Sequence, residues 1–254
     1  MILVKVPTSL GALGEQGQEK APDEIINQLN DIWSNEQGIK PSFEVEEIKI
    51  TDDIEENYNI LEKNFKENSI YIGGDHSITY GLVKGLAKKY KNIGLISFDA
   101  HPDLYHHFDF PTHGDWIKFL IEENILKKEN VILAGIRNAD IKELNYIKEN
   151  KIRVFSSNDI FRNIEEVTEA MMESMRKLDA LYISVDIDVL DPSCAPGTSY
   201  LEPAGLTARE LIYVLQRLKK LKNIKAVDIT EVNPSLDINN ITSKTASKII
   251  MEMS

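Results

Sequence analysis

Residues 93–103 read IGLISFDAHPD, and this stretch decides the fold. Its first six residues form a short apolar run, which is typical of a strand buried inside a sheet. Asp99, His101 and Asp103 follow directly, and alternate residues of an extended segment project to the same side. The stretch therefore predicts a buried strand that ends in a cluster of acidic and histidine side chains.

Three other segments repeat this arrangement of an apolar run with acidic or histidine side chains at its end. They are GGDHS at 73–77, SVDIDVLD at 184–191 and DITEVNP at 228–234. The remaining apolar runs predict strands at 2–6, 70–72, 131–136, 152–155, 181–185 and 224–229. Amphipathic segments between the strands predict helices at 21–33, 78–91, 114–124, 140–149, 164–178, 207–221 and 243–253. The pair Thr207 and Glu210 forms a capping box that marks the start of one of these helices.

This alternation of strand and helix predicts an α/β fold, with three α/β/α layers and a mainly parallel central sheet. No repeat or linker divides the 254 residues, so a single domain over residues 1–254 is expected. In such sheets, ligands bind beyond the carboxyl ends of the strands. The four acidic and histidine segments all follow the carboxyl end of a predicted strand, so topology and chemistry indicate the same edge of the sheet.

The composition excludes several classes of partner. A formal net charge of −12 argues against binding to nucleic acid or to an anionic membrane, because both require a basic face. It favours a cationic substrate only weakly, since most excess acid is expected on the solvated surface. No run approaches the roughly 20 apolar residues of a membrane span. With one cysteine, Cys194, and no signal-peptide pattern at the start, a cytoplasmic location is expected.

The clustered carboxylates predict a metal site. A single Asp after a strand is usually a turn or cap residue, and His76 alone would be a packing histidine. Several carboxylates buried together would instead repel one another and protonate unless cations lay between them. Oxygen-rich ligands with imidazoles suit manganese better than a thiolate-type zinc site, and a pair of such ions favours hydrolysis. The predicted ligands of two Mn²⁺ ions are His76, Asp99, His101, Asp103, Asp186 and Asp188.

The motifs GGDHS, SFDAHPD, SVDIDVLDPSCAPGT and EVNP, in this order, resemble those of the ureohydrolase family. This family includes arginase, agmatinase, guanidinobutyrase and formiminoglutamase. The resemblance begins with the loop VPTSLGALGEQGQEKAPDEI at 6–25 and covers nearly the whole chain. It implies an arginase-like fold, two manganese ions and a homo-oligomer, either a trimer or a hexamer.

The resemblance also implies a role for each site residue. His76, Asp99, Asp103 and Asp186 would bind the deeper ion, and His101, Asp99, Asp186 and Asp188 the second, with Asp99 and Asp186 bridging. Asp103 would also orient the hydroxide that attacks the guanidinium carbon, and Glu231 would hold the guanidinium nitrogens. His113 would carry a proton to the leaving amine, the alternative being a histidine of a surface loop.

The expected substrate-binding residues are Tyr105, His107, Asp140 and Glu143. The segment 104–112 is shorter than its arginase counterpart and matches agmatinases in length and in Tyr105, and Glu202 is also agmatinase-like. Asp140 and Glu143 correspond to acids that address the α-amino group in arginases, or else they cap a helix and stabilise its first turn. His107 is expected at the entrance of the site, or simply in solvent.

These observations predict a binuclear manganese amidinohydrolase that converts a linear guanidino compound to urea and an amine. Agmatine or a guanidino acid is favoured as substrate, and the alternatives are an arginase or a formiminoglutamase-like amidine hydrolase. A non-catalytic metal-binding relative is a remote alternative, because such a protein is expected to have lost a ligand, Glu231 or His113. Residues 199–201, SYL, replace the usual Gly-Thr-Pro of the family and leave the substrate open.

Overall fold

The computed structural model describes residues 1–14, 16–105 and 108–254. In these residues a single eight-stranded sheet has the order β2-β1-β3-β8-β7-β4-β5-β6, and every neighbouring pair is parallel. The strands are β1 (Ile2–Val6), β2 (Glu44–Glu47), β3 (Ser69–Gly73), β4 (Ile93–Phe98), β5 (Val131–Ile136), β6 (Arg153–Ser156), β7 (Ala180–Asp186) and β8 (Ile224–Thr230). The predicted α/β class with a mainly parallel sheet is therefore confirmed.

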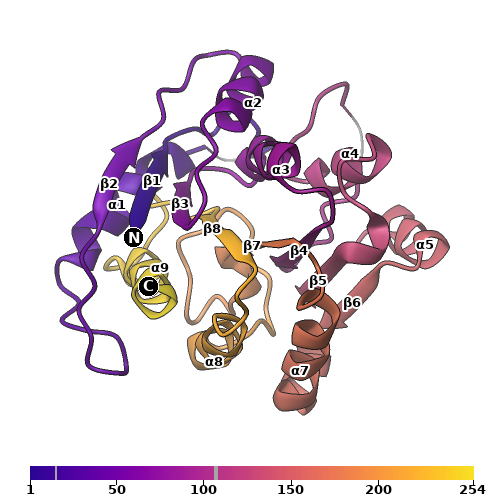
Figure 1. Ribbon diagram of the computed structural model, residues 1–254. Helices are drawn as coiled ribbons and strands as arrows, with labels where there is room; N and C mark the ends of the chain where they lie inside the picture. Colours follow the sequence, from indigo (N-terminus) through magenta and orange to yellow (C-terminus); the bar gives the residue numbers. More distant parts are fainter. Residues whose placement is uncertain (15, 106–107) are drawn as a thin grey trace.

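Helices cover both faces of this sheet (Figure 1). One layer holds α2 (Ile54–Lys63), α3 (Ile78–Lys89), α4 (Trp116–Glu122) and α5 (Ile141–Asn150). The other holds α1 (Ala21–Leu29), α6 (Ser157–Arg162), α7 (Ile164–Met175), α8 (Ala208–Leu218) and α9 (Ile241–Met253). Short 3-10 turns lie at Gln18–Lys20, Lys128–Asn130 and Ile187–Val189.

The apolar run of β4 is continuous because both faces of the strand are buried. Ile96 and Phe98 pack into the core beneath α1, α7, α8 and α9, whereas Ile93 and Leu95 pack into the core beneath α2, α3 and α4. All six residues of β4 are buried. Each large apolar side chain removed from water in this way contributes about 1.5–3 kcal/mol, so the central strands anchor the edge on which the site is built.

The structure differs from the sequence-based expectations mainly at the periphery. Strand β2, with the sequence EVEE, was not expected, because it lacks an apolar run. It lies at the edge of the sheet and is largely exposed, where charged residues are the usual protection against pairing with another chain. The helices α2 and α6 were also not predicted. The seven predicted helices and seven predicted strands are present, with the predicted ends in β1, β4 and β5 and with shifted ends elsewhere.

The strand order brings the four motif segments together. Strands β3, β8, β7 and β4 are consecutive neighbours in the sheet, although β3 and β4 are joined only by α3 in the chain. Strands β7 and β8, which come much later in the sequence, lie between them. The segments that follow these four strands therefore meet at one edge, as the carboxyl ends of parallel strands must.

Candidate active site

The first motif, GGDHS, ends β3 and passes tightly under the loop that follows β1. A Cβ atom on Gly74 would lie 1.6 Å from the carbonyl oxygen of Thr8, so no larger residue fits there. Asp75 is not directed at the histidine and aspartate clusters. Its carboxylate accepts hydrogen bonds from the backbone N–H groups of Gly11 and Ser77, at 3.1 and 2.9 Å. Asp75 thus connects this motif to the loop that follows β1, and His76 is the residue of the motif that faces the carboxylates.

Two clusters of imidazole and carboxylate groups lie at the carboxyl edge of the sheet. His76 Nδ1 lies 3.0 Å from Asp103 Oδ2, 3.2 Å from Asp99 Oδ2 and 3.3 Å from Asp186 Oδ2. In the second cluster, His101 Nδ1 lies 3.1 Å from Asp188 Oδ2 and 3.5 Å from Asp99 Oδ1. Asp99 belongs to both clusters and offers one oxygen to each. The six predicted metal ligands are thus brought together in two adjoining groups.

These groups fit a pair of cations. His76 Nδ1 and Asp99 Oδ2 are buried and have no hydrogen-bond partner among the described residues. Burial and the neighbouring carboxylates raise the pKa of Asp186 well above its usual value and that of Asp103 to about 8, and they raise the pKa of Asp188 as well. The site is therefore unfavourable for ionised carboxylates by themselves, and bound cations would relieve that repulsion. Carboxylate oxygens with imidazole nitrogens suit a divalent ion.

A buried network behind His76 sets the orientation of its ring. His76 Nε2 lies 2.8 Å from Ser184 Oγ, and this hydroxyl donates to Asp228 Oδ1 at 2.5 Å. Because Ser184 donates to Asp228, it accepts from His76 Nε2–H, which leaves Nδ1 as the ring nitrogen that faces the carboxylates and would bind a cation. Thr79 and Tyr182 also donate to Asp228 Oδ2, at 2.7 and 2.8 Å. Outer networks of this kind fix both the tautomer and the position of a ligating histidine.

Two of the predicted catalytic residues hold strained backbone conformations. Asp103 has φ 54° and Glu231 has φ 62°, in the left-handed region that side chains other than glycine rarely occupy. Such conformations cost about 1–3 kcal/mol and occur most often at functional sites. The indole Nε1 of Trp116 donates to Asp103 Oδ2 at 2.6 Å and helps to hold that carboxylate in place.

Glu231 and His113 form a pair beside the clusters. Glu231 Oε1 accepts from the backbone N–H of His76 at 2.8 Å and from His113 Nδ1 at 3.0 Å. Burial alone would raise the pKa of Glu231, but the charge and hydrogen bond of His113 outweigh it, so this pKa is lowered. Burial opposes protonation of His113, yet Glu231 raises the His113 pKa to about 9. The N–H of Leu13 lies 3.1 Å from the other ring nitrogen, Nε2, so Nδ1 is the nitrogen whose proton is shared with Glu231.

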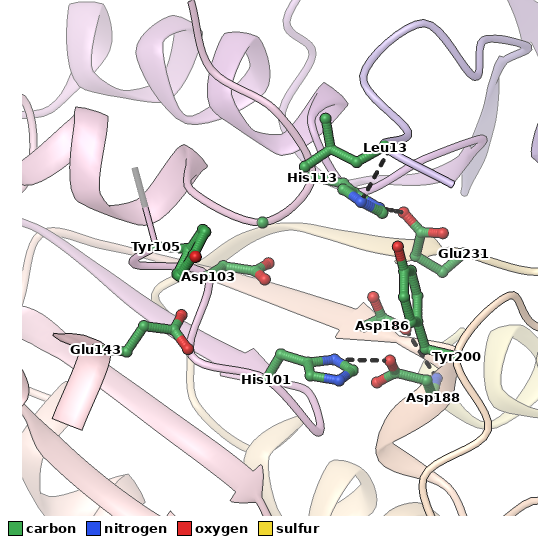
Figure 2. Close-up of a pocket in the computed structure, with 11 residues that line it drawn as sticks. Leu13, His101, Asp103, Tyr105, His113, Glu143, Asp186, Asp188, Tyr200 and Glu231 are labelled. Carbon is green, nitrogen blue, oxygen red and sulfur yellow. Dashed lines mark hydrogen bonds and ion pairs between the residues drawn. The ribbon is translucent and has the colours of Figure 1, made fainter. Parts of the chain in front are cut away.

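These residues surround a cavity of about 190 Å³ (Figure 2). This volume is below the roughly 300–1,000 Å³ of pockets for drug-sized ligands, so the cavity suits a small molecule. Figure 2 shows Glu231 and Glu143 on opposite sides of the cavity, with Asp186, Asp188 and His101 along its wall. The lining residues are Leu13, His101, Asp103, Tyr105, His113, Gly114, Glu143, Asp186, Asp188, Tyr200 and Glu231.

Only some of the expected substrate-binding residues line the cavity. Tyr105 and Glu143 line the cavity. Asp140 is exposed and caps the start of α5, where its carboxylate accepts from the N–H of Lys142 at 2.8 Å. It lies on a shallower depression beside the cavity rather than in its lining. His107 lies outside the described residues. Substrate contact by these residues stays a prediction.

Several residues around the cavity were not expected from the sequence. Leu13 and Tyr200 line it, although neither belongs to an acidic or histidine motif. Glu202 Oε1 lies 3.5 Å from His101 Nε2 and accepts from Asn138 Nδ2 at 2.7 Å. The sequence singles out Glu202 and the segment 199–201 only for their bearing on the substrate, and their place beside the clusters arises from tertiary packing.

A parallel sheet whose carboxyl edge gathers carboxylates and imidazoles around a cavity is typical of α/β enzymes that bind divalent metal ions. A family model described as Arginase family matches residues 1–254. The chain therefore belongs to the arginase family, whose members hydrolyse carbon–nitrogen bonds of amidino groups. Within the described residues, no helix combines the length and the apolar character that a membrane crossing requires.

Three similar proteins show how wide the family is. An arginase of Staphylococcus aureus (strain MSSA476) is 32% identical over 252 residues, which cover 93% of this chain and 82% of that protein. The crystal structure of formimidoylglutamase from Bacillus subtilis has a TM-score of 0.90 and 27% identity, and covers 99% of this chain and 85% of its own. The structure of the proclavaminate amidino hydrolase of Streptomyces clavuligerus also has a TM-score of 0.90, at 25% sequence identity. The match covers 99% of this chain and 89% of that protein chain.

Proposed function

We propose that this protein is a manganese-dependent amidinohydrolase that splits a small linear guanidino compound into urea and an amine, with agmatine as the favoured substrate. The observation that carries this proposal is the Glu231 carboxylate, which lines the same cavity as the two carboxylate and imidazole clusters. Its lowered pKa keeps it ionised at neutral pH. A guanidinium ion is planar and presents paired N–H groups, which a carboxylate accepts in parallel.

The residues around the cavity would divide the work of the reaction. His76, Asp99, Asp103, Asp186, His101 and Asp188 would hold the two ions. When bound, these ions would lower the pKa of a water molecule and make it a nucleophile near neutral pH. Glu231 would orient the guanidinium group with its carbon toward the clusters.

His113 would act on the leaving nitrogen. Its Nδ1 lies 3.0 Å from Glu231 Oε1, and the His113 pKa of about 9 keeps the ring protonated at neutral pH. A guanidinium that binds to Glu231 competes for that oxygen, so its arrival would free Nδ1–H from this contact. The protonated ring can then give this proton to the amine nitrogen as the carbon–nitrogen bond breaks, which leaves a neutral imidazole and is general acid catalysis.

The far end of the cavity favours a substrate with a cationic tail. Glu143 lines that end, and its two carboxylate oxygens accept one backbone hydrogen bond each, from Leu104 at 3.0 Å and Asp140 at 2.9 Å. As far as the described part of the chain shows, each oxygen thus keeps room for a further donor. Among the described residues that line the cavity there is no lysine or arginine to pair with a carboxylate tail. An ammonium tail, as in agmatine, therefore suits this end better than the carboxylate of a guanidino acid.

A specific contact supports the alternative of a carboxylate-tailed guanidino or formimino compound. Lys142 Nζ lies 5.6 Å from the centroid of the Tyr105 ring, and Tyr105 lines the cavity. The Lys142 side chain is exposed, so it can reorient at modest cost and meet an anionic tail at the entrance. Lys142 and Glu143 are adjacent in the sequence and carry opposite charges, which makes them a matched pair for a test.

The test is hydrolysis by manganese-loaded protein of agmatine, 4-guanidinobutyrate, 3-guanidinopropionate, arginine and formiminoglutamate. Urea is measured for the guanidines and formamide for the last compound. We expect agmatine to give the highest kcat/KM. Glu143→Gln should lower that value by about tenfold or more through KM, as for loss of one charged hydrogen bond, whereas Lys142→Gln should leave it unchanged.

The reverse pattern, in which Lys142→Gln is the harmful change and an acid is the best substrate, would establish the alternative. If no compound in the panel is hydrolysed although both metals are bound, the proposed activity is wrong.

A further inference from the structure

The segment that precedes α1 contacts both His113 and Glu231, the residues proposed to act as the acid and to bind the guanidinium group. The carbonyl oxygen of Gly11 accepts from the backbone N–H of His113 at 3.0 Å, and the N–H of Leu13 contacts the ring of His113. Further along the same segment, Gln18 contacts Glu231. The proposed catalytic histidine therefore contacts Gly11 and Leu13 of this segment, and the proposed guanidinium-binding carboxylate contacts its Gln18.

Gln18 makes a buried contact with the oxygen of Glu231 that points away from His113. Its Nε2 donates to Glu231 Oε2 at 3.1 Å and also lies within hydrogen-bond distance of Ser199 Oγ, at 3.1 Å. The exposed fraction of Gln18 is 0% and that of Glu231 is 3%. At this burial a donor of the right geometry has a large effect on the carboxylate, because water does not compete for the same position.

The local backbone is shaped to deliver this contact. Gly17 has φ 144°, and a Cβ atom there would lie 2.3 Å from Asn233 Oδ1. Asn233 belongs to the loop that follows Glu231, and its Nδ2 donates to the carbonyl oxygen of Gln16 at 3.3 Å. The segment thus packs against the loop that carries Glu231, and this packing brings the side chain of Gln18 to the Glu231 carboxylate.

The acceptor positions of Glu231 show what Gln18 does. An ionised carboxylate has about four such positions. The N–H of His76 and Nδ1 of His113 occupy two on Oε1, and Gln18 occupies one on Oε2. Counting the described residues, one position on Oε2 stays available, and a second one on Oε1 opens when His113 moves. Paired N–H groups of a guanidinium require both of these positions at once, in one plane.

We propose that Gln18 is a positioning residue that fixes the plane of the Glu231 carboxylate for a guanidinium group. The terminal torsion of a glutamate side chain is broad, so donors on only one oxygen would leave the carboxylate plane poorly defined. The donor on Oε2 removes this freedom before the substrate arrives. This inference rests on the proposed function, because it takes Glu231 as the group that receives the guanidinium.

The principal variant is Gln18→Met, which keeps the length and unbranched shape of the side chain but removes its donor. A second variant, Gln18→Glu, keeps the shape and places an acceptor against Glu231. The control is Gln16→Leu, since Gln16 lies in the same segment with an exposed side chain. Metal content per chain and thermal unfolding are measured for every variant.

Two binding measurements probe the role of Gln18. We expect Gln18→Met to raise KM for the guanidino substrate and the inhibition constant of free guanidinium ion by the same factor, about ten- to hundredfold, as for loss of a hydrogen bond to a charged group. Inhibition by the amine product, which does not carry the guanidinium, should be unchanged, and kcat should fall less than KM rises. Gln18→Glu should show a larger effect in the same direction, and Gln16→Leu none.

Calorimetric titration of metal-loaded protein with guanidinium chloride separates this inference from the proposed function. If wild-type protein hydrolyses no guanidine, the proposed function fails, yet the affinity for guanidinium still reports on Gln18. Unchanged affinity in Gln18→Met and Gln18→Glu overturns the positioning role even where urea is released. An equal loss in Gln16→Leu, or a parallel rise in the inhibition constant of the amine product, overturns it as well, since either would show a general disturbance of the segment.

Discussion

For the metal-free chain, the free energy of unfolding is expected to decrease as the pH rises. Asp103, Asp186 and Asp188 are buried, and burial together with neighbouring carboxylates raises their pKa. The pKa of Asp103 rises from 3.8 to about 8. A carboxyl group with a higher pKa in the folded state binds more protons when folded, so the free energy of unfolding decreases as the pH rises through that interval.

The size of the effect follows from the interval between the two pKa values. Between pH 5 and pH 8, Asp103 is protonated in the folded metal-free chain but ionised in the unfolded chain. Each pH unit lowers the free energy of unfolding by about 1.4 kcal/mol, so this group alone accounts for a loss of about 4 kcal/mol. At roughly 2–4 °C per kcal/mol for a chain of this size, Tm should fall by roughly 10 °C. Asp186 and Asp188 act in the same direction.

The assay is thermal unfolding of chelator-treated and manganese-loaded protein across the range from pH 5 to pH 8. The stabilisation that the ions provide should grow with pH, because the ligands must be ionised to bind them. Asp103→Asn is the control, and its metal-free form should lose part of the pH slope. A Tm of the metal-free chain that is flat or rises toward pH 8 would refute the reasoning that these carboxylates are buried together at a cost.

Three further predictions concern single side chains. Asp188→Ala should abolish activity and lower the metal content measured by elemental analysis, while far-ultraviolet circular dichroism stays unchanged; an active variant with both metals would disprove the ligand assignment. His113→Ala should keep its metals and lose about 10²–10⁴ in kcat, the usual range for a general acid, and equal turnover at every pH would remove His113 from the mechanism. Glu202→Gln should weaken the binding of one of the two metals by about 10–100-fold, because Glu202 lies behind the outer nitrogen of His101; unchanged competition with a metal chelator would contradict this.

The fold was predictable to a large extent because its signals are local. Buried parallel strands appear as continuous apolar runs, and β4 and β5 were predicted with the ends that the structure shows. Strand β2 was missed because an exposed edge strand has no need of such a run. The predicted trimer or hexamer stays a prediction, since local patterns do not define an interface.

For the site, the sequence indicated the groups that carry the chemistry, and the structure added those that hold them. Asp228 was noticed only as part of a motif, whereas it supports His76 through Ser184. Gln18 lies in the loop at 6–25 that takes part in the resemblance, but nothing singled it out there, because a glutamine in a glycine-rich loop resembles any solvated polar residue. Only the packing of that loop against the residues after β8 buries it against Glu231.

The sequence by itself thus determined the class of fold, the edge of the sheet that carries the site and the types of ligand, because all three depend on short-range order along the chain. The tertiary structure alone decided that β7 and β8 lie between β3 and β4, which places four distant motifs side by side. It also decided that Asp103 and Glu231 take left-handed backbone conformations and that Leu13, Gln18 and Tyr200 reach the site. The physical reason is that these features arise from contacts between segments far apart in the chain, and no local periodicity encodes such contacts.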